Sequence, residues 1–254
     1  KEAGVDVIYK VGGAQAVAAM AYGTESIPKV DKIFGPGKGS FTLAKQLVSG
    51  RNTSIDMPAG PSEVMVMADE SANVKFVAAD LLSQAEHGRD SQAIVVCNSF
   101  KLAEAVAEEV ERQAMQLSRG EYIAESLKNS RAVVFSERED MIAFANEYAA
   151  EHLIISMQDA WSVVDEITAA GSIFVGNYSP ESAGDYASGT NHTLPTSGWA
   201  HSCSGVNIDS FMRKMTIQEL SKEGLRGLAT TIVAMADAEG LEAHAAAVKV
   251  RMEN

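Results

Sequence analysis

The chain has 254 residues, of which 46% are hydrophobic and 22% charged, proportions typical of a soluble globular protein with one large core or two smaller ones. A formal net charge of -13 with scattered basic residues argues against a nucleic-acid partner, because binding to phosphates needs a basic face. No apolar run approaches the roughly 18–20 residues that span a bilayer, so no membrane partner is expected. Cys97 in an apolar run and Cys203 in a loop indicate a reduced, cytoplasmic setting rather than a disulfide framework.

Short β-rich runs alternate along the chain with Ala-rich amphipathic stretches. The expected strands are Asp6–Val11, Lys32–Phe34, Thr53–Asp56, Val64–Ala68, Ala93–Cys97, Ala132–Phe135, Leu153–Ser156 and Ser172–Val175. The expected helices are Ala14–Tyr22, Thr42–Ser49, Val74–Leu82, Leu102–Leu117, Met141–Ala149, Trp161–Ala169, Met215–Ala236 (with Gly224 or Gly227 as a candidate break) and Leu241–Arg251. Strand–helix alternation with apolar strands predicts an α/β fold with a mostly parallel sheet covered on both faces.

Two segments divide this pattern. Pro58–Pro61 is the best candidate for a passage between two parallel-sheet units, and 180–204 is a long loop-like stretch of the kind that usually serves a function. We expect a partial first unit over 1–60, a second unit over 61–205 and a helical tail over 206–254. The chain begins at Lys1 with a strand expected almost at once, which indicates an entry part-way through a fold.

The segment Ser83–Gly88 closes an expected helix and places Gln84 and His87 three residues apart. On a helix this spacing puts both side chains on one face, about 5–6 Å apart at their Cβ atoms. An imidazole beside an amide oxygen provides half of a zinc or manganese site. A His near a helix end is more often a cap or a packed side chain, so the segment alone leaves both interpretations open.

Other candidate positions are similarly ambiguous when taken one at a time. Glu151 and His152 stand at the entry to an apolar strand, where a cation at a helix C-terminus is the simpler interpretation of His152. Asp185 either completes a metal set or forms an Asx-turn. His192 either contacts a substrate or ties down its loop, and His244 on an Ala-rich helix is by itself an ordinary solvated residue.

The Gly-rich segment 35–40 suggests a phosphate-binding loop but fails as one. Lys32 stands in the place of the required first Gly, and Gly39 in the place of the Ser or Thr. The G-x-G-x-x-G spacing of a dinucleotide-binding turn is also missing. A Gly-rich turn that opens a helix still offers backbone N–H groups to an anion.

Seven segments form long motifs: Val11–Ala16, Lys32–Gly37, Asp56–Val64, Asp80–Gly88, Glu151–Ile155, Ser179–Thr196 and Glu239–His244. Together they resemble the histidinol dehydrogenase family, which catalyses the last reaction of histidine biosynthesis, over essentially the whole chain. Members of the family carry a further N-terminal portion. The resemblance implies Rossmann-like parallel-sheet units, the first incomplete at the N-terminus and on the NAD side of the enzyme, followed by a C-terminal helical tail.

The resemblance also implies the chemistry. L-Histidinol would be oxidised to L-histidine through a bound aldehyde in two NAD-dependent hydride transfers. Glu151 and His152 would be the proton-transfer pair, with His152 accepting the alcohol proton and Glu151 activating the water that hydrates the aldehyde. One zinc ion would be held by Gln84, His87, Asp185 and His244. The substrate would be held by Ser62, His192 and Glu239, the last pairing with its ammonium group.

For the cofactor and the assembly, Gln15 matches a position that contacts NAD, whereas Lys38 departs from the Asn usual in the family. The family is an intertwined homodimer in which the tail completes the partner's site, so Glu239 and His244 would act in the other subunit. Two alternatives remain. One is a paralogous zinc- and NAD-dependent alcohol dehydrogenase, which His192 and Glu239 disfavour. The other is a catalytically inactive fragment that binds metal or dimerises.

Overall fold

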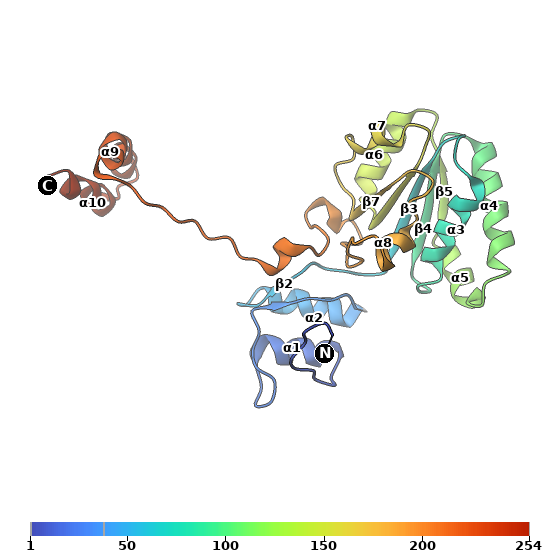
Figure 1. Ribbon diagram of the computed structural model, residues 1–254, viewed down its shortest axis with the longest axis horizontal. Coiled ribbons are helices and arrows are strands. Elements are labelled where there is room, and N and C mark those ends of the chain that lie inside the picture. The colour runs from blue at the N-terminus through green and yellow to red at the C-terminus, as the bar shows by residue number, and fades with distance from the viewer. Residues whose placement is uncertain (1, 38, 254) are drawn as a thin grey trace. The chain divides into compact units, whose positions relative to one another are not determined.

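The structure is a computed structural model that describes residues 2–37 and 39–253, so the question of Lys38 lies outside the described residues. By its internal contacts the chain separates into two compact units, Lys1–Phe211 and Met212–Asn254. The expected division near residues 60 and 205 stays a prediction. In the larger unit, strands and helices alternate as the sequence indicates, and the fold is α/β with parallel sheets (Figure 1).

The first part of the larger unit contains a two-stranded parallel sheet with two helices. The sheet pairs β1 (Lys32–Ile33) with β2 (Ser54–Ile55), and the helices are α1 (Gly13–Tyr22) and α2 (Gly39–Ser49). The strand expected over Asp6–Val11 is wrong: these residues have no regular structure, and the side chain of Ile8 is 77% exposed. Within the described residues this segment has no neighbouring strand with which to exchange backbone hydrogen bonds, and an isolated strand is not stable.

A five-stranded parallel sheet forms the second part. Its strands are β3 (Glu63–Ala68), β4 (Gln92–Cys97), β5 (Arg131–Val134), β6 (His152–Ser156) and β7 (Ser172–Val175), in the order β5-β4-β3-β6-β7. In the centre, Val64 pairs with Ala93 on one side and His152 on the other. This register brings the first residues of β3 and β6 to the same edge.

Helices cover both faces of this sheet, as the apolar strands predict (Figure 1). On one face lie α3 (Val74–Ala85), α4 (Phe100–Ala114) and α5 (Gly120–Leu127), and on the other α6 (Arg138–Tyr148) and α7 (Ala160–Val164). Successive residues of β3 alternate between the two cores, Val64 and Val66 toward α3 and Met65 toward α6. Helix α5 is absent from the sequence-based expectation, and α7 is shorter than expected.

The segment after β7 contains more structure than the expected loop. Helix α8 (Glu181–Tyr186) forms immediately after Pro180, and two short 3-10 helices span Trp199–His201 and Ile208–Phe211. Pro180 has no N–H to leave unpaired, so it suits the residue that precedes a helix. The expectation of a loop over 180–204 is therefore wrong for α8, which carries Asp185.

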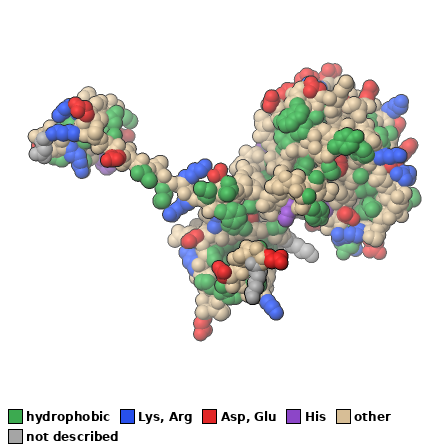
Figure 2. All heavy atoms as spheres, in the orientation of Figure 1, with side chains coloured by type: hydrophobic (Ala, Val, Ile, Leu, Met, Phe, Trp, Pro, Cys, Tyr) green, Lys and Arg blue, Asp and Glu red, His purple; other side chains and the backbone are tan. Residues whose placement is uncertain are grey.

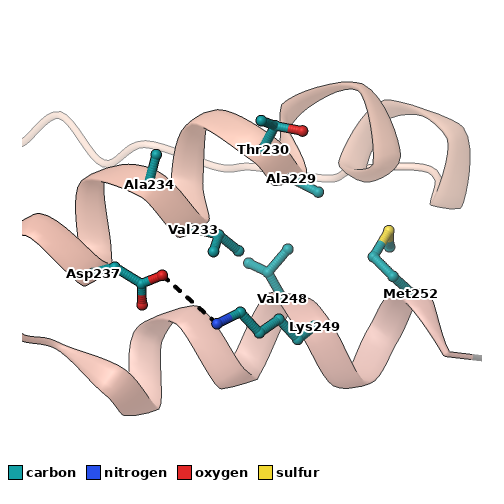
Figure 3. A pocket seen from close by; sticks show the side chains of 8 residues that line it. All are labelled: Ala229, Thr230, Val233, Ala234, Asp237, Val248, Lys249 and Met252. Atoms are coloured by element: carbon teal, nitrogen blue, oxygen red, sulfur yellow. Dashed lines mark ion pairs between the residues drawn. The ribbon is translucent and has the colours of Figure 1, made fainter.

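The smaller unit contains α9 (Lys222–Ala238) and α10 (Glu242–Met252). The Ser221 hydroxyl accepts the Gly224 N–H at 3.0 Å and caps α9, which runs unbroken past both candidate glycines but does not include the expected first turn at Met215. Figure 3 shows the groove between the two helices, where Val233 faces Val248 and Asp237 pairs with Lys249 at 3.7 Å. Among the described residues no helix is long and apolar enough to cross a membrane.

Candidate active site

The end of α3 supplies two of the expected site residues. Gln84 lies in the last turn of the helix and is fully buried, whereas His87 lies in the turn that follows and is exposed. The helix ends at Ala85, so the two side chains do not share one helical face as the spacing predicts. In a parallel sheet the helix between β3 and β4 returns the chain to the amino ends of the strands, and this places both residues at that edge.

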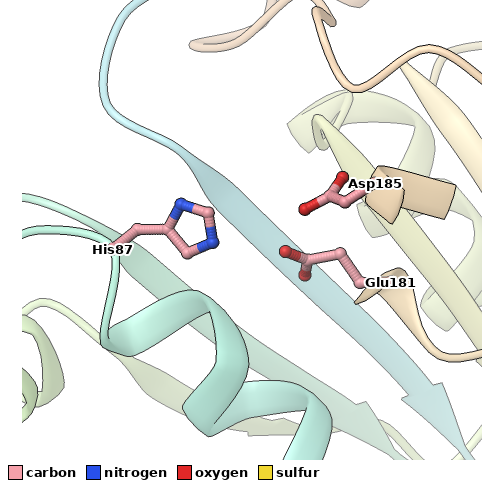
Figure 4. Close-up of side chains that lie close together, drawn as sticks. All are labelled: His87, Glu181 and Asp185. Carbon is pink, nitrogen blue, oxygen red and sulfur yellow. The ribbon is translucent and has the colours of Figure 1, made fainter. Parts of the chain in front are cut away.

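Helix α8 brings two carboxylates to the same place. Glu181 and Asp185 are four residues apart and therefore share a face of the helix. One donor atom from each of His87, Glu181 and Asp185 lies within 4.8 Å of the others. In Figure 4 the three side chains point toward one another. Imidazole nitrogen and carboxylate oxygen are donors that zinc accepts, so this cluster fits a metal ion.

Glu181 is the member that sequence reasoning missed. Its side chain is 1% exposed and lies against the Gln84 side chain. The hydrogen-bond network assigns the amide so that its nitrogen donates to Oε1 of Glu181 at 3.0 Å and to Oε2 at 3.2 Å. The one signal in the sequence is the four-residue spacing to Asp185, which has meaning only once the segment is known to be helical.

The pair Glu151 and His152 lies buried at the start of β6. His152 Nδ1 is 3.2 Å from the Glu63 carbonyl oxygen, and since a carbonyl only accepts, Nδ1 carries the proton. Nε2 is then an acceptor; it is buried, has no hydrogen-bond partner, and lies 3.8 Å from Oδ1 of Asp185. Burial lowers the pKa of His152, which favours this neutral form. The imidazole is thus prepared to accept a proton.

Several carboxyl groups around the cluster are held partly protonated. Burial, followed by the charges of Asp185, Glu151 and Asp80, raises the pKa of Glu181 to about 9. Burial raises the pKa of Glu151 to about 8 and that of Asp80 to about 7. Each carboxylate disfavours ionisation of its neighbours, because like charges repel strongly where water is excluded.

Glu63 is a second residue that sequence reasoning missed, and it acts through both backbone and side chain. Its N–H donates to Oε2 of Glu151 at 2.8 Å, while its carbonyl oxygen accepts from His152. Its side-chain Oε1 accepts the Ser197 N–H at 3.0 Å, and nearby the Gly60 N–H donates to the Thr196 hydroxyl at 2.6 Å. The start of β3 and the residue Gly60 before it are therefore tied to Glu151 and His152 and to the loop that follows His192.

The remaining expected residues lie in different places. Ser62 immediately precedes β3 and is half-buried, and His192 is exposed in its loop, close enough that its charge lowers the pKa of His152. Gln15 is exposed in the first turn of α1, with its amide folded over Gly13. Glu239 at the end of α9 and His244 in α10 are exposed in the smaller unit.

The fold and the donor set define a class: an α/β protein with a buried Glu–His pair beside a candidate metal centre. Residues 1–252 match the model of the histidinol dehydrogenase family, and the chain belongs to that family.

Similar proteins agree with this assignment. The histidinol dehydrogenase of Bacteroides fragilis strain YCH46 is 59% identical over 251 residues, which are 99% of this chain and 59% of the relative. That of Escherichia coli K12 is 54% identical, covering 98% and 58%. The crystal structure of the Elizabethkingia anophelis enzyme superposes with a TM-score of 0.96 at 52% identity, covering 98% of this chain and 58% of that one. The chain thus spans about three fifths of the length of these relatives.

Proposed function

We propose that the chain takes part in the NAD-dependent oxidation of L-histidinol to L-histidine. Removal of a hydride and a proton from the alcohol gives the aldehyde, addition of water gives the hydrate, and removal of a second hydride together with two protons gives the carboxylate. The observation that carries the proposal is the buried acceptor Nε2 of His152, which faces Asp185 at 3.8 Å beside a cluster of metal donors. Membership of the histidinol dehydrogenase family supports the substrate.

Zinc fits the residues present, because the cluster combines one imidazole with carboxylate donors. Gln84, His87 and Asp185 would hold the ion, together with His244. When bound, zinc would supply a template for the imidazole and amino nitrogens of the substrate. The acidic character of the cluster supports a cation here: after burial, the charges of Asp185, Glu151 and Asp80 add to the rise in the pKa of Glu181.

His152 would act as the general base for the alcohol. Its Nδ1 donates to the Glu63 carbonyl, which fixes the tautomer and leaves Nε2 bare. Glu151 would take a proton from the water that adds to the aldehyde. A pKa of about 8 suits this role, since a base works best when its pKa is near the working pH. Ser62 and His192 would hold the substrate.

The cofactor and the second unit complete the proposal. Gln15 lies in the first turn of α1, which begins at Gly13, and this helix end offers free backbone N–H groups that suit a phosphate. NAD bound there would supply the hydride acceptor. Glu239 and His244 would come from a second copy of the chain in a homodimer, with Glu239 pairing with the substrate ammonium group.

Product analysis with the 254-residue chain, NAD, zinc and L-histidinol tests the proposal. We expect two NADH for each histidine formed. His152→Asn should slow both oxidations by about 100- to 10,000-fold. Glu151→Gln should stall after the first oxidation, so that a carbonyl trap captures the aldehyde. Zinc binding without any NADH would refute the activity for this chain and favour the non-catalytic alternative.

Complementation tests the homodimer. His87→Ala and His244→Ala each remove one ligand, but from different units of the chain. If sites form across two copies, a mixture of the two variants contains some sites with both ligands, and zinc binding should recover in part. A mixture that binds no more zinc than either variant alone would contradict the shared site.

A further inference from the structure

Beside the candidate metal donors, a buried amide faces a buried carboxylate. Gln84 is 0% exposed and Glu181 is 1% exposed, so water competes with neither. One end of the Gln84 amide lies 3.0 and 3.2 Å from the two oxygens of Glu181, and the hydrogen-bond network assigns the nitrogen to that end. A bound cation favours the ionised form of Glu181, and since an ionised carboxylate only accepts whereas the amide nitrogen only donates, the contact then distinguishes the two ends of the amide.

We propose that Glu181 is a positioning residue that orients the Gln84 amide and thereby presents its oxygen to the metal ion. The inference rests on the metal site of the proposed function. An amide binds a cation through oxygen and never through its NH2 group. Its two orientations differ by rotation about one soft torsion, so a neighbour must select between them. With the nitrogen held by Glu181, the oxygen points away from that carboxylate.

The rival interpretation makes Glu181 a metal ligand itself, since one of its oxygens lies within 4.8 Å of donor atoms of His87 and Asp185. Two observations favour positioning. With the amide so assigned, both of its oxygens accept from Gln84. Glu181 is also buried to nearly the same extent as Gln84, whereas His87 is exposed, so water does not compete for the contact between Glu181 and the amide. Residues of this kind, which hold a ligand by hydrogen bonds, commonly set metal affinity.

Zinc affinity, measured by competition with a chromophoric chelator, separates the two roles in the 254-residue chain. The variants are Glu181→Met, which removes both acceptors, Glu181→Gln, which keeps one acceptor and removes the charge, and each in a Gln84→Met background. Glu86→Gln is the matched control, because it removes a carboxyl group at the end of α3 that belongs to no part of the cluster.

Glu181→Met should weaken zinc binding by about 10- to 100-fold, and Glu181→Gln should stay closer to wild type. In the Gln84→Met background, Glu181→Met should add little, since Glu181 acts through Gln84. An undiminished effect in that background, or equal losses for Met and Gln, would overturn the positioning role. Thermal unfolding of the metal-free variants checks the fold, and the near-isosteric Glu181→Gln with its double variant gives the same test if Glu181→Met unfolds.

The same titrations distinguish this inference from the proposed function. A wild-type chain that binds zinc while every Glu181 variant binds equally well would overturn only the positioning role. A wild-type chain that does not bind zinc would overturn the metal site and the inference with it.

Discussion

A buried ion pair in the first part of the larger unit gives the most quantitative prediction for stability. Lys45 is 1% exposed and its ammonium group contacts the Asp56 carboxylate, whose side chain is fully buried. Asp56 also accepts the N–H groups of Gly35 and Met57, each at 2.7 Å, and Lys45 donates to the Gly35 carbonyl at 2.6 Å. The two charges therefore compensate each other, and their hydrogen bonds to the backbone fix the turn that joins β1 to α2.

Asp56→Ala would leave the Lys45 ammonium buried with a single carbonyl partner. Breaking a buried pair in this way costs about 3–5 kcal/mol, mainly because the remaining charge is not compensated. The N–H groups of Gly35 and Met57 lose their acceptors as well, which places the expected loss in the upper half of that range. The double variant Lys45→Met/Asp56→Asn removes both charges and keeps one acceptor, so it should lose less than the single variant.

Urea unfolding followed by far-UV circular dichroism measures these losses in all the variants under one set of conditions. Asp31→Ala is the matched control, because it removes an exposed Asp from the same part of the larger unit. A loss below about 1 kcal/mol for Asp56→Ala would refute the reasoning, because that is the value of a solvated surface pair. A double variant less stable than Asp56→Ala would also contradict it, since the cost would then not come from an unpaired charge.

Three further predictions concern the candidate site. Gly171→Ala should destabilise the chain and disturb Glu151, because an added Cβ would lie 2.5 Å from the Glu151 carbonyl oxygen; a thermal unfolding temperature equal to wild type would contradict this. Glu63→Ala should loosen the loop at Ser197, seen as faster amide hydrogen exchange there, whereas Glu63→Gln should retain protection. In metal-free wild-type protein, the free energy of unfolding should fall as the pH rises from 5 to 8, and Glu151→Gln should abolish this contribution to the fall. The folded chain keeps a proton on Glu151 up to a pKa of about 8 that the unfolded chain releases near 4.5, so wild-type stability falls as pH rises through this window.

The sequence predicts the large parallel sheet well because each of its strands contains a continuous apolar run. Each residue of β3 is buried, and a run of that kind has no alternative but the centre of a sheet covered on both faces. The same criterion fails at Asp6–Val11, which also contains an apolar run but has no neighbouring strand among the residues that the structure describes. A strand is stable only when it pairs with another strand, so the sequence of one segment alone does not determine whether it forms.

The candidate site shows the same limit. Gln84, His87 and Asp185 come from motifs that resemblance connects, and α3 and α8 bring them to one edge of the sheet. Glu181 and Glu63 lie in the same motifs, but the sequence does not single them out, because only the structure shows that they are buried and which distant residues they contact. Glu63 contacts Ser197, 134 residues away, and no local pattern encodes that contact.

The position of the site also has an electrostatic reason. Parallel sheets usually bind ligands at the carboxyl ends of their strands, where helix N-termini attract anions. The cluster of His87, Glu181 and Asp185 lies at the opposite edge, where α3 ends at Ala85 and carries the partial negative charge of a helix C-terminus. That charge adds to the carboxylates and favours a cation over a phosphate. The proposed metal ion at the amino edge and the proposed dinucleotide at the N-terminus of α1 would therefore need opposite local charges, and the two proposed sites lie on different elements.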